Sequence, residues 1–162
     1  MNYRIATIED LKSIILLKDT VKSNNKKIQL DIWQNGYPNN ELILSDIQKG
    51  HARVVEEEGH IIAFTSFQNS NEEYPNENLP KDFMTFSRLM VHSNRQNRGI
   101  GTFFLQHLMQ EAQSQHQRGL FITVDSFNKS AIHLYKKMGF QKKGTIQIPQ
   151  AAFILDSYEF IF

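Results

Sequence analysis

The sequence of 162 residues contains no cysteine. This absence excludes disulfide bonds, thiolate metal ligands and a cysteine nucleophile, and it fits a cytoplasmic protein. An excess of charge of one sign is also lacking, because the formal net charge is +1. A nearly neutral chain lacks the strongly basic surface that attracts nucleic acid or an anionic membrane. We therefore expect neither of these partners.

Long apolar runs and metal-binding patterns are missing as well. No stretch approaches the roughly 18 apolar residues of a membrane-spanning helix, and the N-terminus has no signal-peptide pattern. His107 and His116 are nine positions apart, and the sequence has no His-Glu-x-x-His pattern. We therefore predict a cytoplasmic protein that binds no metal ion.

Apolar residues make up 40% of the chain, which suffices for a core, and the length fits a single domain over residues 1–162. Periodicity and turn residues predict an α/β protein with the element order β-α-α-β-β-β-α-β-α-β-β. A right-handed crossover should place the strand 120–124 beside the strand 83–92, parallel to it. The expected strands are 2–6, 51–57, 60–68, 83–92, 120–124, 140–148 and 152–162, and the expected helices are 7–24, 41–49, 99–117 and 128–138.

A polar segment with glycines joins the expected central strand to the next helix. The pattern Gln96-x-x-Gly99-x-Gly101 stands where the first N–H groups of that helix have no acceptor within the helix. Glycines let a ligand approach these donors, and Arg95 and Arg98 add positive charge. The pattern favours a site for a di-anion such as a pyrophosphate, although two turn glycines are the alternative. It matches neither the dinucleotide fingerprint nor the Walker loop.

The expected helix 128–138 carries a second pattern, Asn128-x-x-Ala131-x-x-Leu134-Tyr135-x-x-x-Gly139-Phe140. Alone, this pattern describes an amphipathic helix whose tyrosine is half buried. The two patterns together, in this order, resemble the GCN5-related N-acetyltransferase (GNAT) superfamily over residues 86–140. The resemblance implies a mixed, splayed sheet that holds acetyl-CoA beside its central strand. It also implies acetyl transfer to a primary amine of a small molecule or peptide.

The same resemblance implies roles for individual residues. Residues 96–102 would hold the pyrophosphate of coenzyme A, and main-chain groups of Met90 and Val91 would pair with its pantetheine arm. Asn128 would contact the cofactor, and Tyr135 matches the family's tyrosine near the thioester sulfur, often the general acid. The expected cofactor-binding residues are Met90, Val91, Arg95, Gln96, Asn97, Arg98, Gly99, Ile100, Gly101, Thr102 and Asn128.

Two proton transfers accompany such a reaction. A free tyrosine titrates at about 10 and a thiol at about 8.5, so transfer from Tyr135 to a thiolate is uphill by about 2 kcal/mol. Donating a hydrogen bond to the sulfur without full transfer is the alternative. An ammonium acceptor must lose its proton, which calls for a base. The candidates are Glu72 and Glu73 in a polar loop and His92 at the end of the central strand, with bound water as the alternative.

The acceptor should be chosen by the stretches with the least pattern, 29–40 and 69–82. Trp33 and Tyr37 lie in the first stretch, where they either pin a loop to the core or line the acceptor pocket. Arg88 is unusual in an apolar strand. It either faces the acceptor pocket and binds an anionic group of the substrate, or it pairs with a buried acid.

The chain ends in the apolar sequence Phe160-Ile161-Phe162. Such a terminus must be covered by the sheet or by a second subunit, and we predict a homodimer. The alternative to an enzyme is a non-catalytic protein with the same fold that binds or senses acyl-CoA and lacks a base.

Overall fold

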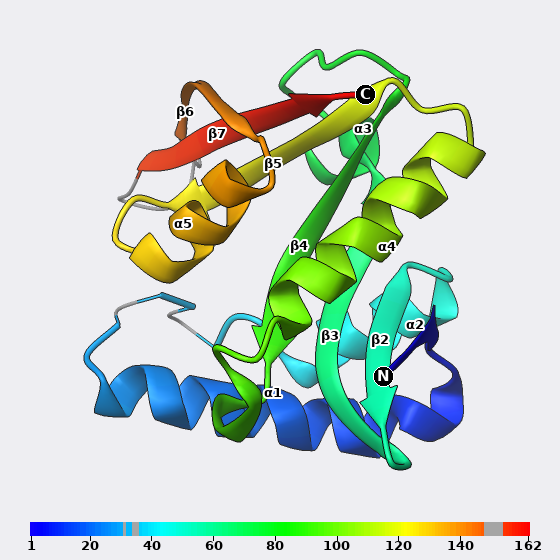
Figure 1. Cartoon of the computed structure of the whole chain (residues 1–162), viewed down its shortest axis with the longest axis vertical. Coiled ribbons are helices and arrows are strands. Elements are labelled where there is room, and N and C mark those ends of the chain that lie inside the picture. The colour runs from blue at the N-terminus through cyan, green and yellow to red at the C-terminus, as the bar shows by residue number, and fades with distance from the viewer. Residues whose placement is uncertain (31, 34–35, 148–153) are drawn as a thin grey trace. The chain divides into compact units, whose positions relative to one another are not determined.

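The computed structural model describes residues 1–30, 32–33, 36–147 and 154–162 (Figure 1). The chain divides into two compact units, which are considered one at a time below. Unit 1 comprises Met1–Phe67 and Arg88–Phe104, and unit 2 comprises Gln68–Ser87 and Leu105–Phe162.

The strands form a seven-stranded mixed sheet in the order β1-β2-β3-β4-β5-β7-β6. The predicted α/β class and element order are confirmed, and a single-turn helix, α3, is added before β4. The strands are β1 Asn2–Ile5, β2 Ala52–Glu57, β3 His60–Asn69, β4 Phe83–Val91, β5 Gly119–Asp125, β6 Gln141–Gln147 and β7 Ile154–Ile161. The helices are α1 Leu11–Lys27, α2 Asn40–Gln48, α3 Ser70–Glu73, α4 Ile100–Ser114 and α5 Lys129–Lys137, with 3-10 turns at Ile8–Asp10 and Ser93–Arg95.

Unit 1 has its core between the helices α1 and α2 and the strands β2 and β3. In Figure 1, α1 runs along the lower edge of the view, across the ends of these strands. Apolar side chains recur every three or four positions on both helices and are buried in this core. The largest members of the core are Ile14, Leu17, Val21, Ile43, Ile47, Val54, Phe64 and Met90.

The entry to α1 is fixed by polar contacts of Asp10. Its carboxylate accepts a hydrogen bond from the backbone N–H of Thr7 at 2.8 Å. The Arg4 guanidinium donates to the same carboxylate at 2.7 and 3.0 Å, and it also donates to Glu56 at 2.8 Å. Hydrogen bonding from Arg4 lowers the pKa of Asp10. The predicted helix start at Thr7 is therefore confirmed, and a charged pair ties it to β2.

In unit 2, β4 and β5 begin side by side. Their parallel pairing joins Phe83 to Gly119 and Met84 to Leu120, which confirms the predicted crossover. A Cβ atom at Gly119 would lie 2.2 Å from the carbonyl oxygen of Phe160, so this position requires glycine. Strand β7 pairs antiparallel with β5 and with β6, as predicted for the last two strands. The predicted strand ends at 148 and 152–153 lie outside the described residues.

The stretch between β3 and β4 is held at both ends by side chains. Asn69 caps α3 and donates from Nδ2 to the carbonyl of Lys81 at 2.8 Å. The Ser70 hydroxyl donates to the carbonyl of Phe83 at 2.9 Å, and Asp82 pairs with Arg118 at 3.2 Å. This stretch is therefore a compact loop with a helical turn.

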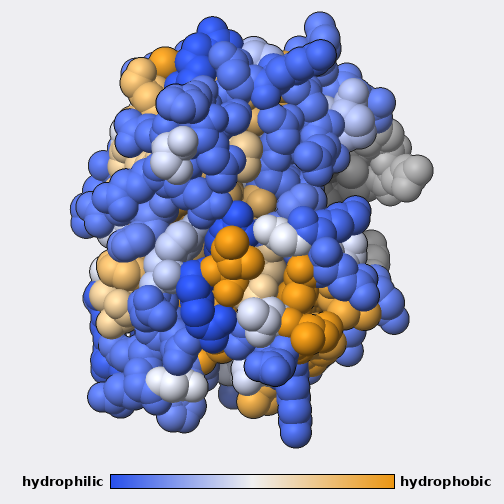
Figure 2. Space-filling model, turned by 90° about the vertical axis from the view of Figure 1, so that its right-hand side faces the viewer, coloured by the Kyte–Doolittle hydropathy of each residue, from blue (hydrophilic) through white to orange (hydrophobic). Residues whose placement is uncertain are grey.

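Figure 2 shows the side of the molecule on which β1 and the start of α1 lie. Hydrophilic residues cover most of it, and apolar side chains gather in its lower half. Large apolar residues near the N-terminus that are more than half exposed are Met1, Ile5, Ile8 and Leu16. In the described part of the chain, no helix combines the length and the apolar character needed to cross a membrane. The predicted homodimer stays a prediction.

Candidate functional site

The loop between β4 and α4 exposes a helix N-terminus in unit 1. The first bond within the helix runs from the N–H of Phe103 to the carbonyl of Gly99 at 2.9 Å. The N–H groups of the three residues between them, 100–102, therefore precede the first acceptor in the helix. Gly99 has φ +77° and is exposed, and no atom lies within 4 Å of where its Cβ would be. These donors and the positive end of the helix dipole form a cradle for an anion.

The two arginines of this loop differ in their surroundings. Nη1 of Arg95 lies 2.7 Å from the Glu57 carboxylate of β2, so its charge is balanced locally. Arg98 is exposed and is the only charged residue in the sequence 96–102. The positive charge that the loop offers an anion therefore comes mainly from Arg98 and from the backbone.

The end of β4 presents main-chain groups rather than side chains. The Met90 side chain is buried in the core of unit 1, so only its backbone is available to a ligand. The carbonyl of Val91 accepts a long hydrogen bond from Nε2 of Gln96 at 3.4 Å. A bound ligand that pairs with Val91 would share or displace this contact. Both observations fit the predicted use of backbone groups at Met90 and Val91.

His92 follows β4 and is half buried. Its backbone N–H donates to the carbonyl of Ile62 at 2.9 Å. Its Nδ1 accepts from the backbone N–H of Asn94 at 3.2 Å. A neutral imidazole that accepts at Nδ1 carries its proton on Nε2, so neither ring nitrogen can take up a further proton. This geometry disfavours His92 as a base.

Arg88 lies in the middle of β4 and pairs with a buried acid, which is one of the two alternatives that the sequence left open. Its Nε and Nη2 donate to Oδ2 and Oδ1 of Asp46 on α2, at 3.0 and 2.8 Å. Both side chains are almost completely buried. The Ser66 hydroxyl donates to the same carboxylate at 3.1 Å. Nη1 of Arg88 donates to the Tyr37 hydroxyl at 3.2 Å, so the two predicted substrate residues meet.

Asp46 is a site residue that the sequence reasoning missed. A signal was present, because Asp46 lies three positions after Ile43, on the inward face of an amphipathic helix. An acid on such a face and an arginine in an apolar strand each need a partner of opposite charge.

The two aromatic residues before α2 have different surroundings in unit 1. Trp33 is half buried and packs against the core, as expected of a residue that pins the segment. The Tyr37 side chain is 39% exposed. It lines an open depression of about 490 Å³, whose described walls are Gly36, Tyr37, Asn39, Glu41 and Leu42. Tyr37 is therefore placed to meet a ligand.

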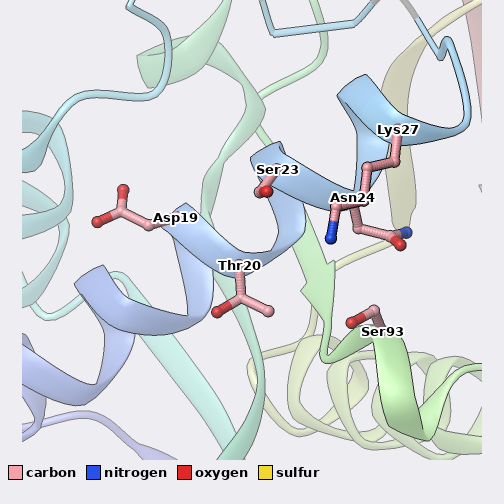
Figure 3. A pocket seen from close by; sticks show the side chains of 6 residues that line it. All are labelled: Asp19, Thr20, Ser23, Asn24, Lys27 and Ser93. Atoms are coloured by element: carbon pink, nitrogen blue, oxygen red, sulfur yellow. The ribbon is translucent and has the colours of Figure 1, made fainter.

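A second depression in unit 1, of about 340 Å³, lies against α1 (Figure 3). Figure 3 shows side chains of α1 along one side of it and Ser93, from the turn after β4, on the other. Its described lining residues are Asp19, Thr20, Ser23, Asn24, Lys27 and Ser93. Hydroxyl and amide groups dominate this surface, and its one acid and one base offset each other.

Tyr135 lies in unit 2 on α5, and it is buried among aromatic rings. Its ring centroid is 5.6 Å from that of Phe86 and 5.9 Å from that of Phe140. Burial, and to a smaller extent the nearby Tyr74, raises the pKa of the Tyr135 phenol well above its usual value. The hydroxyl is therefore protonated at neutral pH and can act as a hydrogen-bond donor.

Three further predicted residues lie in unit 2. Oδ1 of Asn128 accepts from the N–H of Ala131 at 3.3 Å and caps α5, which leaves its amide NH2 to face a ligand. Glu72 is exposed on α3. Glu73, on the same turn, accepts a hydrogen bond from the buried Gln68 amide. Gln68 thus orients Glu73.

Metal ligands do not gather in the described ranges, where no three His, Asp or Glu side chains form a group that could hold an ion. The expectation that the protein binds no metal stays a prediction.

Comparison with known families identifies the protein class. The model of the acetyltransferase (GNAT) family matches residues 19–140. The chain belongs to the GNAT family. No curated protein matches the sequence of this GNAT protein.

Several solved structures share its fold. A GNAT acetyltransferase from Streptococcus agalactiae has 23% identity and a TM-score of 0.86, with 99% of this chain and 95% of that chain covered. A ribosomal-protein-alanine N-acetyltransferase from Brucella melitensis has 23% identity and a TM-score of 0.76, with both chains covered completely. The PaiA N-acetyltransferase from Thermoplasma acidophilum, solved with coenzyme A, has 15% identity and a TM-score of 0.77, with 99% and 98% covered. At these identities the likeness establishes the fold and leaves the acceptor to be argued from this chain.

Proposed function

We propose that this GNAT protein transfers an acetyl group from acetyl-CoA to a primary amine of a small molecule or peptide, by direct attack in a ternary complex. The exposed N-terminus of α4, opened by Gly99 at φ +77°, is the observation that supports it most directly. A cradle of backbone donors with one exposed arginine suits a pyrophosphate. Family membership makes that of coenzyme A the natural candidate.

Under this proposal, residues 96–102 hold the pyrophosphate with their backbone N–H groups, and Arg98 adds charge. Met90 and Val91 offer backbone groups to the pantetheine arm, and the amide of Asn128 makes a further contact. Acetyl-CoA, when bound, supplies an acetyl thioester that an amine attacks, with the thiol as leaving group. A buried strand backbone and a helix terminus are rigid, so the cofactor would be oriented before the acceptor enters.

Tyr135 is proposed to donate a hydrogen bond to the thioester sulfur. Burial raises the pKa of its phenol, so complete proton transfer to a thiolate is more unfavourable than for a free tyrosine. A donor that stays protonated still stabilises charge that develops on the sulfur. Of the two roles open to Tyr135, this argument favours hydrogen bonding over general acid catalysis.

A proton must also leave the attacking ammonium, at a cost of about 4–5 kcal/mol near neutral pH. His92 is a weak candidate because its Nδ1 already accepts a hydrogen bond. Glu73, oriented by Gln68, is a better placed carboxylate than the exposed Glu72. We propose that Glu73 or a bound water molecule takes the proton.

Two measurements on the full chain test the proposal. Calorimetry should show binding of acetyl-CoA, and a free-thiol assay should show release of CoA when a panel of primary amines is added. Tight binding without turnover on any amine would instead favour the acyl-CoA sensor. Absence of binding would overturn both. We also propose a cytoplasmic homodimer, which a monomeric mass by light scattering across concentrations would refute.

A further inference from the structure

The depression before α2 has a defined charge. Glu41 is the one charged residue among its described walls. Arg88 contacts Tyr37 from below but is paired through two hydrogen bonds with Asp46, so this pair contributes no net charge. The local balance is therefore negative, and the depression favours a cation.

The Tyr37 ring is suited to a cation as well. Its hydroxyl accepts from Nη1 of Arg88 at 3.2 Å, which ties the tyrosine to the buried Arg88–Asp46 pair. An aromatic face within about 6 Å attracts an ammonium group. Asn39 adds no charge, because its Oδ1 accepts from the N–H of Leu42 at 2.8 Å as the cap of α2. An acid and an exposed aromatic ring therefore share one small surface.

We propose that this depression binds an ammonium group of the acceptor between the Glu41 carboxylate and the Tyr37 ring. The inference rests on the proposed acetyl transfer, and it names the class of acceptor. An amine that attacks a thioester must be neutral, whereas the group held by Glu41 stays charged. The acceptor therefore carries two amino groups, one acetylated and one held at the depression.

This inference reverses the expectation that follows if the Arg88 charge reached the pocket. An arginine without a carboxylate beside it would select an acceptor with a carboxylate or phosphate. Because Asp46 takes two of the guanidinium donors at 2.8 and 3.0 Å, an anionic acceptor would meet Glu41 without a compensating charge. The geometry thus separates two substrate classes that the sequence left open.

A matched set of acceptors tests the inference. 1,4-Diaminobutane, 1-aminobutane and 4-aminobutanoate share one reacting amine and differ in the group at the other end. We expect the highest kcat/KM for the diamine and the lowest for the amino acid. Glu41→Gln should raise the KM for the diamine about tenfold, with kcat and the KM for 1-aminobutane little changed. Equal effects on the diamine and the monoamine, or a preference for 4-aminobutanoate, would overturn the inference.

Control variants separate charge from structure. Glu9→Gln removes an exposed glutamate from the first turn of another helical element and should leave all three acceptors unchanged. Tyr37→Phe keeps the ring and should change the KM for the diamine less than about threefold, whereas Tyr37→Leu should raise it about tenfold. A Tyr37→Leu protein that resembles the wild type with the diamine would contradict the role of the ring.

A binding measurement keeps this inference distinct from the proposed function. Calorimetry with 1,4-diaminobutane alone should show binding to the wild type that weakens about tenfold in Glu41→Gln. If the diamine binds in this way but no amine is acetylated, the depression is supported and the proposed transfer fails. If amines are acetylated but Glu41→Gln changes neither binding nor KM, the transfer stands and the depression fails.

Discussion

Arg88 and Asp46 form a forked ion pair, with Nε to Oδ2 at 3.0 Å and Nη2 to Oδ1 at 2.8 Å. The side chains are 4% and 5% exposed. The pair ties α2 to β4 at a residue with φ +59°, a conformation that costs about 1–2 kcal/mol for a residue with a side chain. The pair therefore holds the strand in an unusual conformation immediately before the backbone of Met90 and Val91.

Asp46→Asn should lower the free energy of unfolding by about 3–5 kcal/mol, because it leaves the Arg88 charge buried without a counter-ion. Urea titration at pH 7 measures the change. The double variant Asp46→Asn with Arg88→Met should lose less than the sum of the two single variants, since no charge is then buried. A loss below about 1 kcal/mol for Asp46→Asn would contradict a buried pair.

Tyr135→Phe should lower kcat about 100-fold and leave the affinity for CoA unchanged, because it removes a donor needed only when charge develops on the sulfur. Steady-state kinetics and calorimetry measure the two quantities. Tyr158→Phe is the matched control, since Tyr158 is a buried tyrosine on β7. An unchanged kcat in Tyr135→Phe would count against the proposed role.

The pH profile gives a second test of Tyr135. Burial raises the pKa of its phenol, so the protonated form persists above the pH at which a free tyrosine ionises. We therefore expect kcat to show no decline that is due to Tyr135 up to a pH of about 10. A decline below that pH that disappears in Tyr135→Phe would show a lower pKa and favour general acid catalysis.

Asp10→Ala tests the entry to α1. Hydrogen bonds from Arg4 lower the pKa of Asp10 in the folded state, so its carboxylate stabilises the fold above the unfolded pKa. That contribution is lost as the pH falls through the folded pKa. We expect the variant to lose about 1–2 kcal/mol at pH 7 and progressively less below a pH of about 4. Urea titrations across this range measure it, with Glu9→Ala as control, and a loss independent of pH would contradict the pairing.

Much of the fold could be predicted because local signals and burial agree. Helix caps at Thr7, Asn39 and Asn128 stand at the expected starts, and alternation or continuous apolar runs marked the strands. The end of α1 was predicted at 24, but the helix continues to Lys27. Asn25 is buried within it, so packing outweighs the weak helix propensity of asparagine.

The short helix α3 and the Arg88 pair illustrate what the sequence could not provide. Asn69 followed by Glu72 is a cap signal that could have indicated α3, although one turn is too short to show periodicity. The partner of Arg88 is 42 positions away on another element, and no pattern in the sequence connects them. Which way Arg88 points therefore depends on tertiary structure alone.

The central claim is that residues 96–102 hold the pyrophosphate of coenzyme A, and a pair of glycine variants tests it. Gly99 and Gly59 both have φ +77° and open space where a Cβ would stand, but Gly59 lies in the β2–β3 hairpin. Alanine at either position should lower the free energy of unfolding by a similar amount, about 1–2 kcal/mol.

The deciding measurement is the calorimetric Kd of CoA for Gly99→Ala, Gly59→Ala and the wild type. The account predicts that Gly99→Ala weakens binding about tenfold or more, because the added methyl group stands where the phosphates approach the N–H groups of α4. Gly59→Ala should change the Kd less than about twofold. Equal Kd values for the two variants, or a wild-type protein that does not bind CoA, would contradict it.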